Sequence, residues 1–296
     1  MARPDDLWQF WDDAKAELAR VPADAERTPA PEHSSDFALA YHVSLRSVGD
    51  TPIKGWLVAP PVPDGARLAG LLWLPGYGGL GEVDLAIQWA HRGFVTLMLL
   101  PRGQGPEPFP DGAEGKIVSG ITDPAEYAYR SVFLDCLRGF EFLQSQPDVH
   151  PHRVAIGGGS QGGGLALATA ALTDGRAAAV AAHVPFLCGY EWVLRHQIDS
   201  GPYTGLKEFV EENPAILETA GETLQYFDPV NLAEQIACPV YLSSGGKDAV
   251  CPPPTIRMVF DSLPGVKALH HDPDLSHEWR EDSAQHMQRW LGHYLS

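Results

Sequence analysis

The spacing of hydrophobic residues changes along this 296-residue chain, and each change predicts a different kind of structure. Near the N-terminus, apolar side chains recur three and four positions apart, at Leu7, Phe10, Trp11, Ala14 and Leu18. This spacing predicts an amphipathic helix whose aromatic face packs on the body of the protein. A polar, proline-bearing stretch follows it, so we assign residues 1–36 to an N-terminal helix and arm.

Three strand-like segments come next, at residues 37–45, 53–60 and 68–75. Turn-forming residues separate them, with Gly49-Asp50 in the first gap and Pro63-Asp64-Gly65 in the second. We expect these three segments to form an antiparallel edge at which the sheet begins.

Beyond the third segment, helical and strand-like patterns alternate to the C-terminus. The strand-like segments are residues 93–100, 153–158, 177–184, 239–245 and 266–271, and the helical segments are 84–92, 124–146, the run after Ser160, 254–263 and 281–295. Such alternation predicts an α/β fold with a mostly parallel sheet covered by helices on both faces. With 44% hydrophobic residues, the chain has enough apolar material for a single large domain over residues 1–296.

Residues from about 185 to 228 break this alternation, because they are helical in pattern and rich in aromatic and acidic side chains. Functional groups gather at the carboxyl ends of parallel strands, so we expect this helical insertion to cover those ends as a lid or substrate wall. Taken singly, each aromatic residue is better explained as a core side chain. These residues are Phe186, Tyr190, Trp192, Tyr203, Phe209, Tyr226 and Phe227.

One serine stands where an apolar strand-like segment breaks into glycines and a small-residue helix begins. Gly158, Ser160 and Gly162 fit the Gly-x-Ser-x-Gly pattern of a nucleophile elbow, a strained strand-to-helix turn that exposes the serine hydroxyl. The alternative is that Ser160 only caps the helix, but a capping serine needs neither the preceding strand nor glycines on both sides. The pattern therefore favours a nucleophile that attacks a carbonyl group.

A serine nucleophile needs a general base, and the base needs an orienting acid. In the chain order of α/β-hydrolases the acid follows the serine and the histidine comes last. Asp248 comes just after strand-like segment 239–245, and His277 lies directly before the last helix, which can bring it back over the sheet. We therefore predict Asp248 as the acid and His277 as the base, although Asp248 taken alone also fits a solvated turn residue.

Other residues compete for these roles. Asp272 and Asp274 are alternative orienting acids, but they belong to the same loop as His277. His270 and His271 lie nearer the strand and are either structural or metal ligands together with the two aspartates. No His-x-x-x-His spacing accompanies them, so the metal interpretation is weak and we predict no metal site.

The oxyanion hole is expected to use two backbone N–H groups. One belongs to Gln161, directly after the serine, and the other to the loop that follows residues 68–75. In that loop, Pro75-Gly76-Tyr77-Gly78-Gly79 permits close approach of the backbone, and Tyr77 is the candidate donor. The alternative for this loop is a simple glycine turn.

Composition restricts partners and location. The chain has 38 acidic and 21 basic residues, and its formal net charge of −17 opposes binding to nucleic acid or an anionic membrane. The N-terminus carries acids and tryptophans where a signal peptide is basic and continuously apolar, and no segment reaches membrane-spanning length. We therefore expect a cytoplasmic protein.

The four cysteines are widely spaced and form no Cys-x-x-Cys pair. We therefore expect them to be reduced core residues, namely Cys136, Cys188, Cys238 and Cys251.

Three separated motifs coincide in this chain, namely Arg102-Gly103-Gln104-Gly105, Gly158-Gly159-Ser160-Gln161-Gly162 and His277-Glu278. Together they resemble the motifs of carbohydrate esterase family 7, the acetyl xylan esterase and cephalosporin C deacetylase family, and the similarity extends along most of the chain. The resemblance implies an α/β-hydrolase fold in which Ser160 is the nucleophile, His277 the general base and acid, and Asp248 the orienting acid. It further implies that the Tyr77 and Gln161 amides bind the oxyanion.

The same resemblance implies a substrate class. The family removes acetyl groups from small alcohols, including xylo-oligosaccharides and the cephalosporin side chain, inside the cell and without a metal or organic cofactor. We interpret Arg102 and Gln104 as residues that order a loop near the site and take no part in the chemistry.

Four positions near predicted strand ends differ from the residues usual in the family. They are Pro75 in place of histidine, Leu100-Pro101 in place of a pair with an acidic residue, His183 in place of aspartate, and Trp279 in place of glycine. These differences are expected to alter the shape of the substrate site. The segment between Arg102 and Ile121 is also shorter than usual, and in the family this loop contributes to a hexameric ring. We therefore expect a homo-oligomer but leave the number of its subunits open.

The leading hypothesis is a serine esterase that hydrolyses acetyl esters of small substrates through an acetyl-enzyme. A second hypothesis, prompted by the four differences, is a broader short-chain carboxylesterase or a peptidase with the same triad. A third is a catalytically silent binding protein on a hydrolase scaffold. The presence of all three triad members in the expected order speaks against the third.

Overall fold

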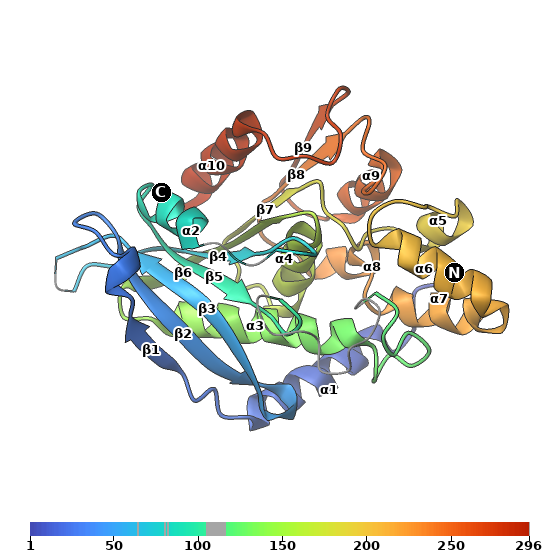
Figure 1. Cartoon of the computed structure of the whole chain (residues 1–296), viewed down its shortest axis with the longest axis horizontal. Coiled ribbons are helices and arrows are strands. Elements are labelled where there is room, and N and C mark those ends of the chain that lie inside the picture. Colours follow the sequence, from blue (N-terminus) through green and yellow to red (C-terminus); the bar gives the residue numbers. More distant parts are fainter. Residues whose placement is uncertain (64, 80, 82, 105–116, 296) are drawn as a thin grey trace.

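The computed structural model describes residues 1–63, 65–79, 81, 83–104 and 117–295 of the chain. In this part of the chain, strands assemble into a sheet with the order β1-β2-β3-β5-β4-β6-β7-β8-β9 (Figure 1). The strands are β1 (Glu26–Pro29), β2 (Leu39–Ser47), β3 (Thr51–Ala59), β4 (Leu68–Leu74), β5 (Phe94–Leu100), β6 (Val149–Gly159), β7 (Ala179–His183), β8 (Val240–Gly245) and β9 (Lys267–Asp272). β1, β2, β3 and β5 pair in antiparallel fashion, and every pairing from β5 through β4 to β9 is parallel.

Helices cover both faces of the sheet, as the alternating pattern predicts for an α/β fold. They are α1 (Leu7–Arg20), α2 (Val83–Ala90), α3 (Ala128–Ser145), α4 (Gln161–Leu172), α5 (Tyr190–Arg195), α6 (Tyr203–Glu212), α7 (Leu217–Gln225), α8 (Pro229–Leu232), α9 (Pro253–Ser262) and α10 (Glu281–Leu295). Short 3-10 turns lie at Pro31–His33, Val48–Asp50, Pro214–Ile216 and Ala233–Gln235. The mostly parallel α/β architecture is confirmed.

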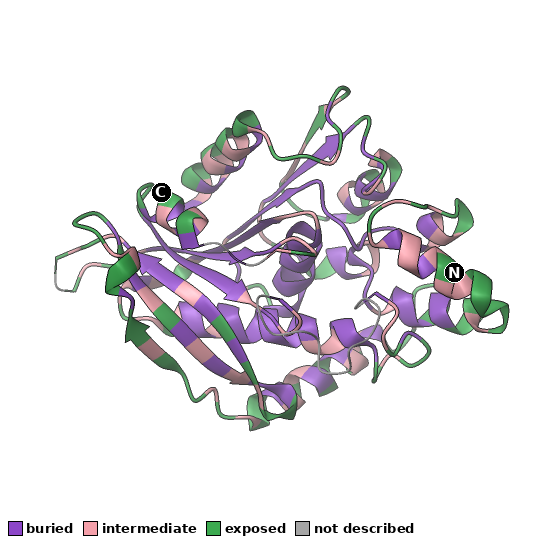
Figure 2. Cartoon of the chain, viewed as in Figure 1, coloured by how far each residue is buried: buried purple, intermediate pink, exposed green. Residues whose placement is uncertain are grey.

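Two hydrophobic cores lie on opposite faces of the sheet. The larger one joins the sheet to α1, α3, α4 and α9, and the smaller one joins it to α2 and α10. Figure 2 shows the central strands and α4 buried along most of their length. β7 and β8 are buried at every position, which explains why their segments are continuously apolar or small and do not alternate.

The antiparallel edge predicted at the start of the sheet is correct for β2 and β3 and wrong for the third segment. That segment is β4, which lies in the interior of the sheet and runs parallel to both of its neighbours. Its composition, Leu68–Leu74 with six of seven residues buried, is typical of a strand covered on both faces. The edge is completed by β1, which lies in the stretch that we assigned to the N-terminal arm and for which we predicted no strand. β1 is short, mostly exposed and ends in proline, all of which suit an edge strand.

The N-terminal helix forms as predicted. In α1, the side chains of Leu7, Trp11, Ala14 and Leu18 are buried, and Phe10 is half-buried. The Trp11 ring stacks on Phe133 of α3, and its Nε1–H donates to the Tyr226 carbonyl oxygen at 2.9 Å. The helix therefore fastens α3 to the chain that follows α7.

Most of the predicted insertion is helical. It contains α5, α6 and α7, which gather at one end of the molecule (Figure 1). Among its aromatic residues, the core interpretation is correct for Phe186, Tyr190, Tyr203 and Phe227, which are at most 2% exposed. The remaining three are half-buried, namely Trp192, Phe209 and Tyr226. The role of this insertion as a lid or substrate wall stays a prediction.

The core position predicted for the cysteines is confirmed for Cys136, Cys188 and Cys251, which are buried, while Cys238 is half-buried. The four cysteines, all within the described ranges, form no disulfide with one another. Over the described ranges, the helices are either too short or too polar to cross a membrane.

Candidate active site

Ser160 occupies a sharp turn between β6 and α4. Its backbone angles, φ 54° and ψ −122°, lie in a region that non-glycine residues rarely adopt. The turn is held by its own main chain, since the Ser160 N–H donates to the His183 carbonyl oxygen at 2.9 Å and the Ser160 carbonyl accepts the Phe186 N–H at 2.9 Å. A strained conformation persists only when surrounding contacts fix it in this way.

The two glycines of the motif permit close backbone contacts that any side chain would prevent. A Cβ atom on Gly158 would lie 2.5 Å from the Gly162 carbonyl carbon, and one on Gly162 would lie 2.0 Å from the Leu74 carbonyl oxygen. The start of α4 therefore packs directly on the end of β4. β4 lies between β5 and β6 in the sheet, so this contact marks the point where the strand order reverses, which is where α/β sheets bind ligands.

The structure brings Ser160, His277 and Asp248 together in one hydrogen-bonded line. His277 Nε2 lies 2.9 Å from Ser160 Oγ, and His277 Nδ1 lies 2.8 Å from Asp248 Oδ2. A carboxylate can only accept, so Nδ1 carries the ring proton and Nε2 is left to accept the serine proton. This is the tautomer that a general base requires.

Asp248 is fixed from behind by backbone groups. Its other oxygen, Oδ1, accepts the N–H groups of Val250 and Cys251 at 2.9 and 2.8 Å, and the residue is only 4% exposed. The solvated-turn interpretation of Asp248 is therefore wrong. One carboxylate oxygen of Asp248 accepts backbone N–H groups of its own loop, and the other accepts the His277 Nδ1–H.

The alternative acids make other contacts. Asp272 lies 3.1 Å from Arg280 Nη1, and Asp274 lies 2.6 Å from Lys247 Nζ. His271 Nδ1 lies 2.8 Å from Ser244 Oγ, at the far edge of the sheet. The structure therefore gives these residues partners outside the triad.

The two predicted oxyanion segments meet beside the nucleophile. Gln161 is the first residue of α4, and the first N–H groups of a helix have no acceptor within it. The loop carrying Tyr77 follows β4, and a Cβ on its Gly76 would lie 3.9 Å from the Gly159 carbonyl oxygen. Both predicted donors thus belong to segments that border Ser160.

Side chains support these segments from outside. The Gln104 Nε2–H donates to the Gly76 carbonyl oxygen at 2.5 Å, which fixes the loop before Tyr77. The Tyr77 ring packs edge-on against Phe186 with 6.2 Å between ring centres. Gln161 is fully buried, and its Oε1 accepts the Tyr129 hydroxyl at 2.8 Å, which joins α4 to α3.

Arg102 joins three parts of the fold through its side chain. Its Nε and Nη2 donate to the two Asp135 oxygens at 2.8 Å, and Nη2 also donates to the Val48 carbonyl oxygen at 3.0 Å. Asp135 lies on α3 with a side chain that is 0% exposed. Arg102 therefore orders the start of the loop after β5, and Gln104 continues from this fixed point to the oxyanion segment.

Replacing Arg102 by alanine is expected to destabilise the protein by about 3–5 kcal/mol, because the buried Asp135 carboxylate loses its paired cation. Chemical denaturation followed by circular dichroism measures this change. Arg257→Ala is the matched control, since it removes an arginine from an exposed ion pair with Asp261 and is expected to leave the stability unchanged. Equal losses in the two variants would contradict the structural role of Arg102.

Two of the four positions that differ from the family meet at the site. The Trp279 ring packs edge-on against His183 with 4.9 Å between centres, and it also borders Gly159, the residue before the nucleophile. Pro75 is buried at the end of β4, and Leu100 packs against Gly81. The shortened loop lies largely at residues 105–116, outside the described residues. Its part in assembly therefore stays a prediction.

Cys251 is a site neighbour that sequence reasoning placed only in the core. Burial raises the pKa of its thiol well above the usual range, and the adjacent Ser160 hydroxyl opposes this shift. In the sequence, its position three residues after Asp248 was the available signal that Cys251 lies near the site.

Among the described residues, ligand atoms of Asp248, Cys251 and His277 form the cluster with metal-ligand spacing, all within 4.8 Å of one another. Two of these residues are already hydrogen-bonded to each other as members of the triad.

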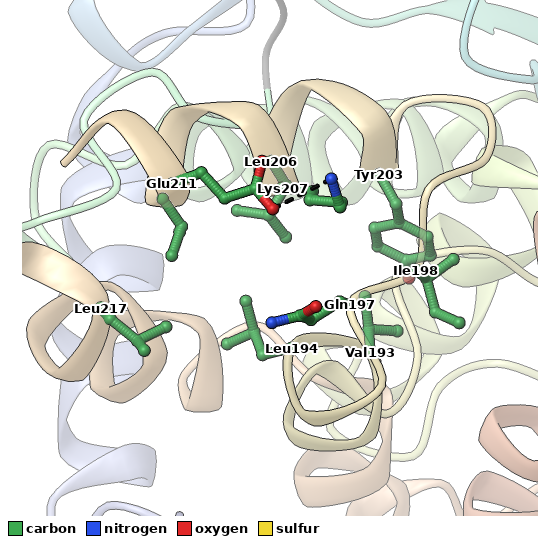
Figure 3. A pocket seen from close by; sticks show the side chains of 10 residues that line it. Val193, Leu194, Gln197, Ile198, Tyr203, Leu206, Lys207, Glu211 and Leu217 are labelled. Carbon is green, nitrogen blue, oxygen red and sulfur yellow. Dashed lines mark ion pairs between the residues drawn. The ribbon is translucent and has the colours of Figure 1, made fainter. Parts of the chain in front are cut away.

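A small cavity lies apart from the triad, inside the helical insertion (Figure 3). Its volume is about 80 Å³, and an ion pair between Lys207 and Glu211 at 3.0 Å stands among mostly apolar walls. Tyr203 forms one wall and also packs on Phe186, with 4.4 Å between ring centres. None of Ser160, Asp248 and His277 lines this cavity, so we do not assign the substrate site to it.

Comparisons with known proteins find relatives along the whole chain. Residues 1–294 match the model of the family described as Acetyl xylan esterase (AXE1). An acetyl xylan esterase from Paenibacillus sp. R4 has a solved structure that is 33% identical, with a TM-score of 0.94 over 100% of this chain and 96% of that one. Acetyl xylan esterase 1 from Thermoanaerobacterium sp. JW/SL YS485 is 26% identical, with a TM-score of 0.92 over 99% of this chain and 95% of that one.

A curated relative extends beyond the matched region. Acetyl esterase Axe7A from Xylanibacter ruminicola is 28% identical over 97% of this chain, and the match spans 66% of the relative's length. The α/β hydrolase GrgF from Penicillium sp. sh18 shares the fold alone, at 19% identity and a TM-score of 0.62 over 86% of this chain and 99% of that one. The whole-chain family match and the close structural agreement lead to one conclusion. The chain belongs to the acetyl xylan esterase family, a family of carboxylic ester hydrolases with the α/β-hydrolase fold.

Proposed function

We propose that this protein is a serine esterase that hydrolyses acetyl esters of small substrates, with Ser160, His277 and Asp248 as its catalytic residues. The observation that carries the proposal is the continuous hydrogen-bonded line from Ser160 Oγ through His277 to Asp248. This line ends at a strained turn beside a helix N-terminus, in a chain that belongs to an esterase family.

In the proposed first step, His277 Nε2 takes the Ser160 hydroxyl proton while Oγ attacks the acetyl carbonyl carbon. The carbonyl oxygen becomes an oxyanion, which accepts hydrogen bonds from the Gln161 and Tyr77 N–H groups. When the tetrahedral intermediate collapses, the C–O bond to the alcohol breaks and protonated His277 gives its proton to the departing alcohol. An acetyl group is left on Ser160.

In the second step, water replaces the alcohol. His277 Nε2 accepts a proton from the water molecule, whose oxygen attacks the acetyl-enzyme, and the bond to Ser160 Oγ then breaks. The serine regains its proton and acetate leaves. Asp248 stays ionised through both steps and stabilises the cationic form of His277.

The substrate class follows from the relatives and from the charge of the chain. The named relatives are acetyl xylan esterases and an acetyl esterase. We therefore propose acetylated xylo-oligosaccharides as substrates, together with cephalosporin C-like compounds, whose acetyl esters offer the same bond. The net charge of −17 suits a neutral or cationic substrate and opposes nucleic acid and anionic membranes as partners. A cytoplasmic location, action without a cofactor and assembly into homo-oligomers stay predictions.

The acyl group is tested by a series of 4-nitrophenyl esters. We expect kcat/KM to be highest for the acetate and to fall as the acyl chain lengthens, because a site built for acetate has no room for added methylenes. Release of acetate from acetylated xylo-oligosaccharides tests the alcohol side. Aryl amides with the same acyl group are expected to remain intact.

Each alternative predicts a different outcome of this assay. A preference for longer acyl chains indicates the broader carboxylesterase, and amide hydrolysis indicates a peptidase. The absence of turnover, together with a failure of a fluorophosphonate to label Ser160, indicates a catalytically silent binding protein.

A further inference from the structure

His183 is a buried polar residue to which the proposed mechanism gives no part. It is the last residue of β7, it is 2% exposed, and it pairs with Gly159 of β6 in the sheet. Its backbone carbonyl accepts the Ser160 N–H at 2.9 Å. The main chain of His183 thus holds the nucleophile directly.

The imidazole of His183 has a hydrogen-bond partner at each nitrogen. Its Nε2 lies 2.8 Å from the Glu278 carbonyl oxygen, which can only accept, so Nε2 carries the proton. Its Nδ1 must then accept, and the Ser243 hydroxyl lies 2.7 Å away as the donor. The neighbouring residues therefore select the neutral Nε2–H tautomer.

Ser243 is held in its turn. Its Oγ accepts the Val184 N–H at 3.1 Å, so its own proton is free to point at His183. Val184 has a φ of 37°, which is an outlier for a β-branched residue and indicates a backbone held under strain. Residues from β7, β8 and the His277 loop are thus joined through one imidazole ring.

Burial lowers the pKa of His183, and the nearby His277 lowers it further. The Glu278 carbonyl oxygen, Asp248 and Asp282 act in the opposite direction. The balance favours the neutral ring, which agrees with the hydrogen-bond pattern.

Glu278 directly follows the proposed base, so its carbonyl oxygen fixes the loop on one side of His277. On the other side, the loop is fixed by main-chain contacts, since the Lys247 N–H donates to the Leu275 carbonyl oxygen at 2.9 Å. The Glu278 side chain is exposed and pairs with Arg280, so it does not itself reach into the site. The partly buried hydrogen bond from His183 therefore ties this end of the loop to the strand beside Ser160.

We propose that His183 is a positioning residue that keeps the base within hydrogen-bond distance of the nucleophile. Its main chain holds Ser160, and its Nε2–H holds the backbone next to His277. The inference rests on the proposed function, because it requires Ser160 and His277 to be the reacting pair. A displacement of about 1 Å between such groups can lower a rate about 100-fold.

The test compares His183→Gln with His183→Asn. The glutamine amide reaches about as far as imidazole Nε2, whereas the asparagine amide is one methylene shorter and cannot reach the Glu278 carbonyl. For 4-nitrophenyl acetate, we expect kcat of His183→Asn to fall about 10- to 100-fold with KM nearly unchanged, because substrate binding does not need the bond. His183→Gln is expected to recover most of kcat. Equal kcat values in the two variants, or a change confined to KM, would overturn the proposal.

Ser243→Ala keeps the proposal testable if His183→Asn does not fold. This change removes the hydrogen bond to Nδ1, so the ring keeps its Nε2–H but loses one of the two bonds that fix its orientation toward the Glu278 carbonyl. We expect kcat to fall in the single variant and no further fall when Ser243→Ala is added to His183→Gln, because glutamine has no acceptor at the position of Nδ1 for Ser243 to bond. An unchanged kcat in Ser243→Ala, or the same loss in both backgrounds, would contradict the inference.

Fluorophosphonate labelling separates this inference from the proposed function. If the wild-type protein is not labelled at Ser160, the proposed function fails. If the wild type is labelled and the His183 variants react equally fast, only the positioning role fails. Thermal unfolding of each variant shows that the compared proteins are folded.

Discussion

Replacing Ser160 by alanine is expected to lower kcat for 4-nitrophenyl acetate by about 10⁴- to 10⁶-fold, the range typical of a lost serine nucleophile. Alanine lacks the hydroxyl that attacks the carbonyl, and no acetyl-enzyme forms. A residual rate is expected from the oxyanion donors alone, since these remain in place. Steady-state hydrolysis of the ester, with mass spectrometry of the fluorophosphonate-treated protein, measures both parts of this prediction.

The matched control is Ser276→Ala, which removes an exposed hydroxyl from the loop beside His277. It is expected to leave kcat unchanged and to be labelled by the fluorophosphonate like the wild type. Comparable activity in Ser160→Ala and the wild type would refute the nucleophile assignment.

The stability of Ser160 variants gives a second readout of the same turn. Ser160→Ala retains a Cβ atom at φ 54°, so the backbone strain stays and the melting temperature is expected to change little. Ser160→Gly removes that atom, and the relief of strain is expected to stabilise the fold by about 1–3 kcal/mol, less the entropy that glycine costs. A gain in stability in the glycine variant, with none in the alanine variant, would show that the turn stores backbone strain at Ser160.

Local patterns in the sequence were sufficient to locate the residues that the structure brings together at the candidate site. The glycines around Ser160 are adjacent in the chain, and the steric need for them is local, so the elbow was readable before the fold was known. Asp248 and His277 were found from the order of strands and helices. Their hydrogen bonds, at 2.8 and 2.9 Å, link residues 29 and 117 positions apart, and only the folded sheet brings them together.

Features that depend on non-local pairing were missed or wrong. β4 lies between β5 and β6 in the sheet. The apolar composition of Leu68–Leu74 indicates that both faces of the strand are buried, but it does not indicate which strands are its neighbours. The partner of Arg102 was missed because Asp135 resembles an ordinary polar residue on a helix. Its apolar neighbours in α3 were the available signal, since a buried acid in such a run requires a cation.

His183 shows the same limit at the site. The sequence marked it as a difference from the family, but its contact with Glu278 joins residues 95 positions apart. The other ring nitrogen is held by Ser243, on yet another strand. The sequence therefore indicated that His183 is unusual, but only the folded chain shows that Glu278 and Ser243 are its hydrogen-bond partners.

Asp248→Asn is expected to lower kcat/KM about 10⁴-fold, because the change reverses the tautomer of His277. Asp248 Oδ1 accepts two backbone N–H groups, and in asparagine only the amide oxygen can take that place. The amide NH₂ then faces His277 Nδ1 as a donor. Nδ1 must accept, so the ring proton moves to Nε2 and points at Ser160 Oγ. In this arrangement the histidine cannot remove the serine proton.

Measurements of kcat/KM for 4-nitrophenyl acetate test this reversal, and the competing acids of the sequence supply the controls. Asp274→Asn makes the same chemical change in a carboxylate that pairs with exposed Lys247, and Asp272→Asn makes it in one that pairs with Arg280. Both are expected to retain wild-type activity, because neither carboxylate contacts His277. A loss in either control as large as that in Asp248→Asn would transfer the role of orienting acid to that residue. Retention of activity by Asp248→Asn would show that the hydrogen bond to His277 does not set its tautomer.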